Sequence, residues 1–191
     1  MKIQYNSIVI LSYFFISLFA LFLNILSHGK SNKVLFSSYR NTLLSPLTYI
    51  RLITHSIGHS NWTHFMNNFL YILLVGPMIE EKYGSIKLLE MILITSLVIG
   101  IFNFIFSKKG IVGASGIVYM LITLSSAVNL SSGSIPLTLI LICLFYVINE
   151  IVNSLFKNDG VSHISHFIGA ICGIVFIFYP LWCIIIKVVV W

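Results

Sequence analysis

Apolar residues occur in long runs along this chain, and short clusters of charged and turn-forming residues separate the runs. A membrane-spanning helix needs about 20 predominantly apolar residues. Six segments approach that length, namely 8–26, 62–79, 86–106, 114–130, 135–155 and 163–190. The pattern therefore predicts an all-α, polytopic membrane protein in which residues 1–191 form a single domain of six transmembrane helices.

The first apolar run and the connection after it differ in character. Segment 8–26 carries no charge, but no small-x-small cleavage site follows it and its apolar run is long for a signal peptide, so we interpret it as a span. The connection 28–61 mixes basic residues with apolar patches such as LLSPLTYI. It is too amphipathic for a simple linker.

Composition supports a membrane protein and excludes several functions. Only 8% of residues are charged and 58% are hydrophobic, whereas about 25% are charged in a soluble domain. The net charge is +6, but the 11 basic residues are scattered through the connections, so no nucleic-acid partner is expected. Cys143, Cys172 and Cys183 all fall in predicted spans. We therefore expect neither a disulfide nor cysteine chemistry.

The basic residues also bear on orientation. Six spans place 4 of them, Lys2, Lys82, Lys87 and Lys187, on the side of the termini and the other 7 on the opposite side. Because basic loops are retained in the cytoplasm, this count favours termini outside.

Three polar clusters interrupt the apolar runs: HSIGHSNWTHFMNN at 55–68, GASGIVY at 113–119 and HISHFIGAICG at 163–173. Polar groups at membrane depth are costly and usually face a bundle interior or a water-filled cavity. These clusters are therefore the candidate functional regions.

Ser115 stands between Gly113 and Gly116 where a helix is predicted to begin. Unpaired amides at a helix N-terminus favour an oxyanion, and flanking glycines would let a substrate backbone approach the hydroxyl. A serine in a membrane helix can equally serve packing alone.

His166 is the candidate base for such a serine. With Gly169 and Gly173 it shares one helix face of small residues, and such a face allows two helices to approach closely. Tyr119 lies one turn after Ser115 and could stack on the imidazole. A purely structural histidine and an ordinary interfacial tyrosine are the alternatives.

His64 and Asn68 are four residues apart, hence on one helix face, and both can donate hydrogen bonds to an oxyanion together with the Ser115 amide. They could also simply link helices. A metal site formed by His55, His59 and His64 is the rival interpretation. The chain has no HExxH motif and its carboxylates lie elsewhere, so we expect no metal and no cofactor.

In combination, these motifs resemble those of the rhomboid family of intramembrane serine proteases over residues 49–173. The matching positions are His59, His64 and Asn68 (H-x4-H-x3-N); Gly113, Ser115 and Gly116 (GxSG); His166, Gly169 and Gly173 (H-x2-G-x3-G); Arg51, Thr54 and His55 (WRxxTH); and Glu80 and Gly84. Ile50 stands in place of the tryptophan that is usual in the family.

The resemblance implies a six-helix core, a partly embedded first loop and a serine endopeptidase acting on membrane-anchored proteins in or near their transmembrane segments. Ser115 would be the nucleophile and His166 the general base and acid, with Tyr119 supporting His166. His64, Asn68 and the Ser115 amide would form the oxyanion hole. It also implies a bacterial plasma-membrane protein whose site opens to the extracytoplasmic side, in conflict with the charge count; we expect the family topology to hold.

A catalytically silent rhomboid-like protein that binds membrane clients is the alternative function. Such proteins typically lack the serine or the histidine, and this chain retains both Ser115 and His166.

Overall fold

A computed structural model of the chain describes residues 5–126, 137, 140–141, 144 and 163–178. Its elements are α1 (Ile8–Leu26), the π-helix η1 (Asn32–Phe36), α2 (Pro46–Thr54), α3 (Trp62–Tyr83), α4 (Ser85–Phe106), α5 (Ser115–Ser126) and α7 (His163–Ile177). The described residues form no β-strand beyond an isolated bridge between Ser38 and Ile111. The predicted all-α fold is confirmed.

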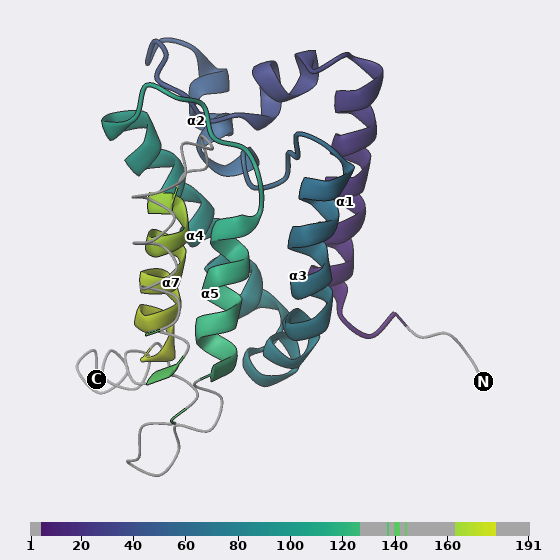
Figure 1. Cartoon of the computed structure of the whole chain (residues 1–191), viewed down its shortest axis with the longest axis vertical. Helices are drawn as coiled ribbons and strands as arrows, with labels where there is room; N and C mark the ends of the chain where they lie inside the picture. Colours follow the sequence, from purple (N-terminus) through teal and green to yellow (C-terminus); the bar gives the residue numbers. More distant parts are fainter. Residues whose placement is uncertain (1–4, 127–136, 138–139, 142–143, 145–162, 179–191) are drawn as a thin grey trace, which may run out of the picture.

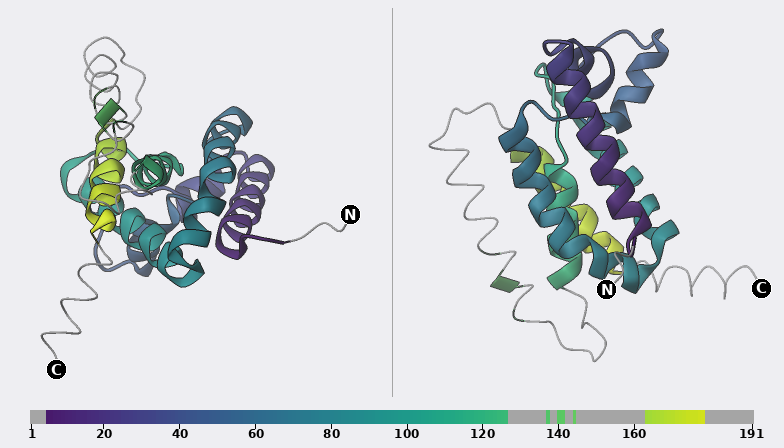
Figure 2. Two further views of the ribbon diagram at one scale, coloured as in Figure 1. Left: turned by 90° about the horizontal axis from the view of Figure 1, so that it is seen from below. Right: turned by 90° about the vertical axis from the view of Figure 1, so that its right-hand side faces the viewer.

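Seen along the bundle, α5 lies among α3, α4 and α7, and α1 packs on the far side of α3 (Figure 2). The elements of the first loop, η1 and α2, gather at the end of the bundle where α3 begins (Figure 1). This end is where the polar clusters of the sequence meet, because α3, α5 and α7 each carry theirs in their first turns.

Two helices, α1 and α4, are long and apolar enough to cross a membrane by length and composition, and α5 and α7 are shorter apolar helices. The predicted span 135–155 lies outside the described residues, apart from 137, 140–141 and 144. The described parts of the spans 114–130 and 163–190 are α5 and α7. The count of six spans therefore stays a prediction.

One predicted boundary was wrong. The second helix was expected to end at Ile79, but α3 continues to Tyr83 with Pro77 inside it. The added turn holds Glu80, whose buried carboxylate accepts hydrogen bonds from the backbone amides of Val9 (3.0 Å) and Ile10 (3.1 Å). The carboxylate thus satisfies amides that the first turn of α1 leaves unpaired. This contact favours keeping the last turn of α3 helical.

An aromatic cluster joins α1 to α3. Phe65 and Phe69 of α3 are almost completely buried and lie 4.6 Å apart between ring centroids. Phe14 of α1 contacts both rings, at 5.5 and 5.4 Å. This packing holds the first turns of α3, and the polar residues on them, in a defined place against α1.

The first loop is ordered by hydrogen bonds rather than acting as a simple linker. Arg51 of α2 is 4% exposed, donates from Nε to the Leu47 carbonyl at 2.9 Å and lies over the Tyr39 ring at 4.5 Å. On α4, Gly100 faces α2 so closely that a Cβ there would lie 2.1 Å from the Leu52 carbonyl oxygen. The short helix α2 is therefore packed against the bundle.

Candidate active site

Ser115 is the first residue of α5. The chain reaches it through Gly113, whose φ is +126° and whose amide donates to the His55 carbonyl at 2.8 Å. Only glycine adopts that backbone conformation readily. Because the first amides of a helix lack intrahelical acceptors, the Ser115 amide is a donor at the positive end of α5.

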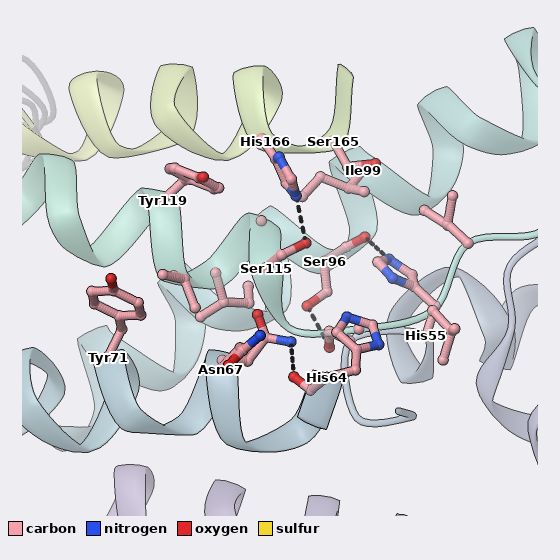
Figure 3. Close-up of a pocket in the computed structure, with 18 of the residues that line it drawn as sticks. His55, His64, Asn67, Tyr71, Ser96, Ile99, Ser115, Tyr119, Ser165 and His166 are labelled. Atoms are coloured by element: carbon pink, nitrogen blue, oxygen red, sulfur yellow. Dashed lines mark hydrogen bonds between the residues drawn. The ribbon is translucent and has the colours of Figure 1, made fainter. Parts of the chain in front are cut away.

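The His166 imidazole is directed at this serine from α7 (Figure 3). Its Nε2 lies 2.9 Å from Ser115 Oγ, although the two residues are 51 positions apart in the sequence. The approach depends on small residues, because Gly169 on α7 packs against the backbone of Gly116 on α5. Gly173 packs against the Thr123 side chain and the Met120 carbonyl. The arrangement is the one a base needs in order to take a proton from a hydroxyl.

Tyr119 lies one helical turn after Ser115, beside His166 (Figure 3). The two rings are 4.6 Å apart between centroids with an interplanar angle of 40°. The tyrosine ring therefore limits the orientations that the His166 imidazole can adopt.

His64 and Asn68 lie in the first two turns of α3, on the wall of the cavity across from α7. The side chain of Asn61 caps this helix by accepting from the His64 amide at 2.8 Å. Asn68 Nδ2 donates to the His64 carbonyl at 2.9 Å, which uses one of its two N–H groups. Both side chains line the same cavity as Ser115 and His166.

The two glycines beside Ser115 serve a purpose that the sequence analysis did not identify. We expected them to make room for a substrate. In addition, a Cβ on Gly113 would lie 2.7 Å from Cε1 and Nε2 of His64, and one on Gly116 would lie 2.3 Å from Cδ1 of Ile99. Both glycines therefore admit neighbouring protein side chains, one of them the candidate oxyanion donor His64.

These residues surround a cavity of about 780 Å³. Its wall includes several polar residues that the sequence analysis did not single out: Ser56, Ser60, Asn67, Tyr71, Ser96 and Ser165. Ser96 lies within the apolar run of α4, and a polar residue inside such a run is the signal that could have identified it. Its Oγ is 2.9 Å from Ser56 Oγ, so a polar region extends beyond the serine and histidine.

The first-loop histidines are not arranged as a metal site. His55 Nε2 lies 2.9 Å from the Ser96 carbonyl, and His59 Nδ1 lies 3.1 Å from the Ile57 carbonyl. Each of these nitrogens is thus already engaged with the backbone. In the part of the chain that the structure describes, no group of three or more His, Cys, Asp or Glu could hold a metal ion.

The chain is similar in sequence to known proteins. The Rhomboid domain model matches residues 46–183. The chain is 25% identical over 144 residues to Rhomboid-like protein 11, chloroplastic, from Arabidopsis thaliana, an alignment that covers 68% of this chain and 51% of that protein. It is 33% identical over 69 residues to Rhomboid protease GlpG of Haemophilus influenzae, covering 36% of each chain.

A third relative, Rhomboid protease GluP of Bacillus subtilis, is 32% identical over 113 residues, which is 56% of this chain and 22% of that protein. The chain therefore spans about half or less of the length of these relatives. They come from bacteria and from a plant chloroplast, so they do not support the expected bacterial origin. Since the family model covers well over half of the chain, this protein belongs to the rhomboid family.

Proposed function

We propose that this protein is an intramembrane serine endopeptidase that cleaves membrane-anchored proteins in or near a transmembrane segment. The observation that carries the proposal is the 2.9 Å contact between His166 Nε2 and Ser115 Oγ. Two relatives bear the name rhomboid protease. The proposal includes a single membrane domain with six spans and a site that opens on the extracytoplasmic side.

In the proposed reaction, His166 takes the proton of the Ser115 hydroxyl as Oγ attacks the substrate carbonyl carbon. The C=O electrons move to the oxygen and form a tetrahedral oxyanion. His166 then returns the proton to the departing amine and the C–N bond breaks, which leaves an acyl group on Ser115. Water, activated by the same imidazole, hydrolyses this ester and restores the free serine.

The developing oxyanion needs hydrogen-bond donors already in place. We assign this role to the Ser115 amide at the start of α5 and to the side chains of His64 and Asn68 on α3. All three belong to residues that line one cavity with His166. Tyr119, in contact with the imidazole, would keep His166 aligned through the successive proton transfers.

No Asp or Glu is among the described residues that line the cavity. The proposed machinery is therefore a Ser–His dyad. Its imidazole contacts the Tyr119 ring and is positioned by the close packing of α7 on α5.

The test is cleavage of a tagged model transmembrane substrate by the purified protein in detergent with a chelator present. Wild type should cleave, and Ser115→Ala and His166→Ala should not. Ser125→Ala is a matched control because Ser125 lies on the same helix, bonds to the Ile122 carbonyl and is not among the residues lining the cavity. Cleavage that persists in Ser115→Ala would refute the dyad.

A fluorophosphonate probe separates the protease from a catalytically silent client-binding protein. The probe should label wild type and Ser125→Ala but not Ser115→Ala, because it reacts with an activated serine. A folded wild-type protein that neither cleaves nor reacts would favour the client-binding function.

A further inference from the structure

The His64 imidazole spans the space between two loops. Its Nδ1 lies 3.1 Å from the hydroxyl oxygen of Ser60, in the loop that precedes α3. Its opposite edge, formed by Cε1 and Nε2, packs against Gly113 in the turn that leads to Ser115. Ser60, His64 and Ser115 all line the same cavity. Nδ1 of His64 therefore faces Ser60, and Nε2 faces the turn that leads to Ser115.

This orientation makes the tautomer of His64 important. A neutral imidazole has one N–H donor and one lone-pair acceptor. If Nδ1 carries the proton, Nε2 is an acceptor and would repel an oxyanion. If Nε2 carries the proton, it can donate, and Nδ1 must then accept a hydrogen bond. The Ser60 hydroxyl can rotate to supply that bond.

We propose that Ser60 is a positioning residue whose hydroxyl donates to His64 Nδ1 and thereby holds the proton of His64 on Nε2. The inference rests on the proposed function, because it assigns His64 as a donor to the oxyanion. Ser60 itself does not touch the reacting atoms. It acts through the imidazole, as an orienting partner acts on a catalytic histidine.

Among the described residues around His64, Ser60 is the one placed to hydrogen-bond to His64 Nδ1. Among the described residues, the histidines that face its ring are His59, with ring centroids 5.1 Å apart, and His166 across the cavity on α7. The other titratable residues that line the same cavity are His55, Tyr71 and Tyr119. The Nδ1 of His59 is engaged with the Ile57 carbonyl. No acid, lysine or arginine is among the described residues lining the cavity, so no carboxylate there competes to orient the ring.

Steady-state kinetics of substrate cleavage test the proposal. Ser60→Ala should lower kcat by about 3- to 10-fold, the usual worth of one hydrogen bond, with little change in KM. Ser60→Thr should restore kcat because it keeps the hydroxyl, and the side chain at this position is exposed and can take a methyl group. Thr63→Ala is the matched control and should behave as wild type, because Thr63 carries an exposed hydroxyl in the first turn of α3, close to Ser60 in the sequence.

The pH dependence distinguishes tautomer control from a structural role. At acid pH a doubly protonated imidazole donates from both nitrogens, so Ser60 is no longer needed. The ratio of wild-type to Ser60→Ala activity should therefore fall toward 1 as the pH decreases. A loss that is equal at every pH, or that Ser60→Thr does not restore, would overturn the proposal.

Nitrogen NMR of ¹⁵N-histidine-labelled protein gives a test that does not require activity, with His64→Gln identifying the His64 signals. Wild type should show neutral His64 protonated on Nε2, and Ser60→Ala should shift the population toward Nδ1–H. A proton on Nδ1 in wild type, or an unchanged spectrum in Ser60→Ala, would contradict the inference. If wild type fails to cleave any substrate, the proposed function fails while the spectrum still decides the tautomer.

Discussion

Gly169 on α7 lies so close to Gly116 on α5 that a Cβ at Gly169 would be 2.1 Å from the Gly116 carbonyl oxygen. No real Cβ contact is that short, and the obstacle is backbone rather than a flexible side chain. Any side chain at Gly169 must therefore push α7 away from α5. The same movement would carry His166, one turn earlier on α7, away from Ser115.

Gly169→Val should reduce cleavage by about 100-fold or more, since a displacement near 1 Å can cost that much in a positioned reaction. The measurement is kcat with the tagged substrate, alongside a check that the variant still inserts into membranes. Ile171→Phe is the control, because it enlarges an exposed side chain on the same helix. Normal cleavage by Gly169→Val would show that close packing is not required.

Asn68→Ala should lower kcat by roughly 100-fold with a much smaller effect on KM, if its amide stabilises charge that exists only in the transition state. The amide already donates one N–H to the His64 carbonyl, which holds it beside the cavity. Kinetics over a range of substrate concentrations separate the two constants. An unchanged kcat would remove Asn68 from the oxyanion hole.

Glu80→Gln should destabilise the fold without acting on the chemistry. The Glu80 carboxylate accepts from the amides of Val9 and Ile10 and from the Ser85 hydroxyl at 2.7 Å, and an amide side chain can accept at only one of its two ends. The free energy of unfolding should fall by about 1–3 kcal/mol, measured by thermal unfolding in detergent. Glu81→Gln, an exposed neighbour, is the control. Equal melting temperatures for the two variants would argue that the hydrogen bonds from Glu80 to the first turn of α1 do not stabilise the fold.

Stability should fall in mild acid because of two buried histidines in the connection between α1 and α3. Burial lowers the pKa of His55 to about 4, and burial together with nearby His64 lowers the pKa of His59 to about 3. The unfolded chain takes up these protons near pH 6.5, whereas the native protein does not. The stability that depends on keeping His55 and His59 neutral is therefore complete above pH 6.5. It is lost as the pH falls toward the pKa values of these histidines in the folded protein.

At pH 5 the expected destabilisation is at most about 2 kcal/mol for each of the two histidines. It is measured as the difference in unfolding temperature between pH 7.5 and pH 5. His55→Gln should reduce this difference, whereas His28→Gln, an exposed histidine, should leave it unchanged. A stability that is the same at both pH values would contradict the prediction.

The sequence by itself predicted the helices α1, α3, α4, α5 and α7, though not η1 or α2, and it identified residues that carry candidate chemistry. The ends of α1 coincide with the predicted 8–26, because an uninterrupted apolar run allows little other than a helix in a membrane. The i, i+4 spacing likewise placed His64 and Asn68 on one face of α3, since helix geometry is local. The motifs that contain Ser115, His64 and His166 could also be recognised from the sequence, because each is a short local pattern.

Only the tertiary structure decided how these pieces meet. The charges and glycine of EEKYGS at 80–85 suggested a helix end at Ile79, but the contact of Glu80 with the first turn of α1 accompanies a helix that continues to Tyr83. The role of Gly113 in admitting the His64 ring likewise depends on which loop lies against which helix. Such contacts join residues whose proximity no local periodicity encodes. They arise when close packing at small residues, as between Gly116 and Gly169, selects one arrangement of the helices.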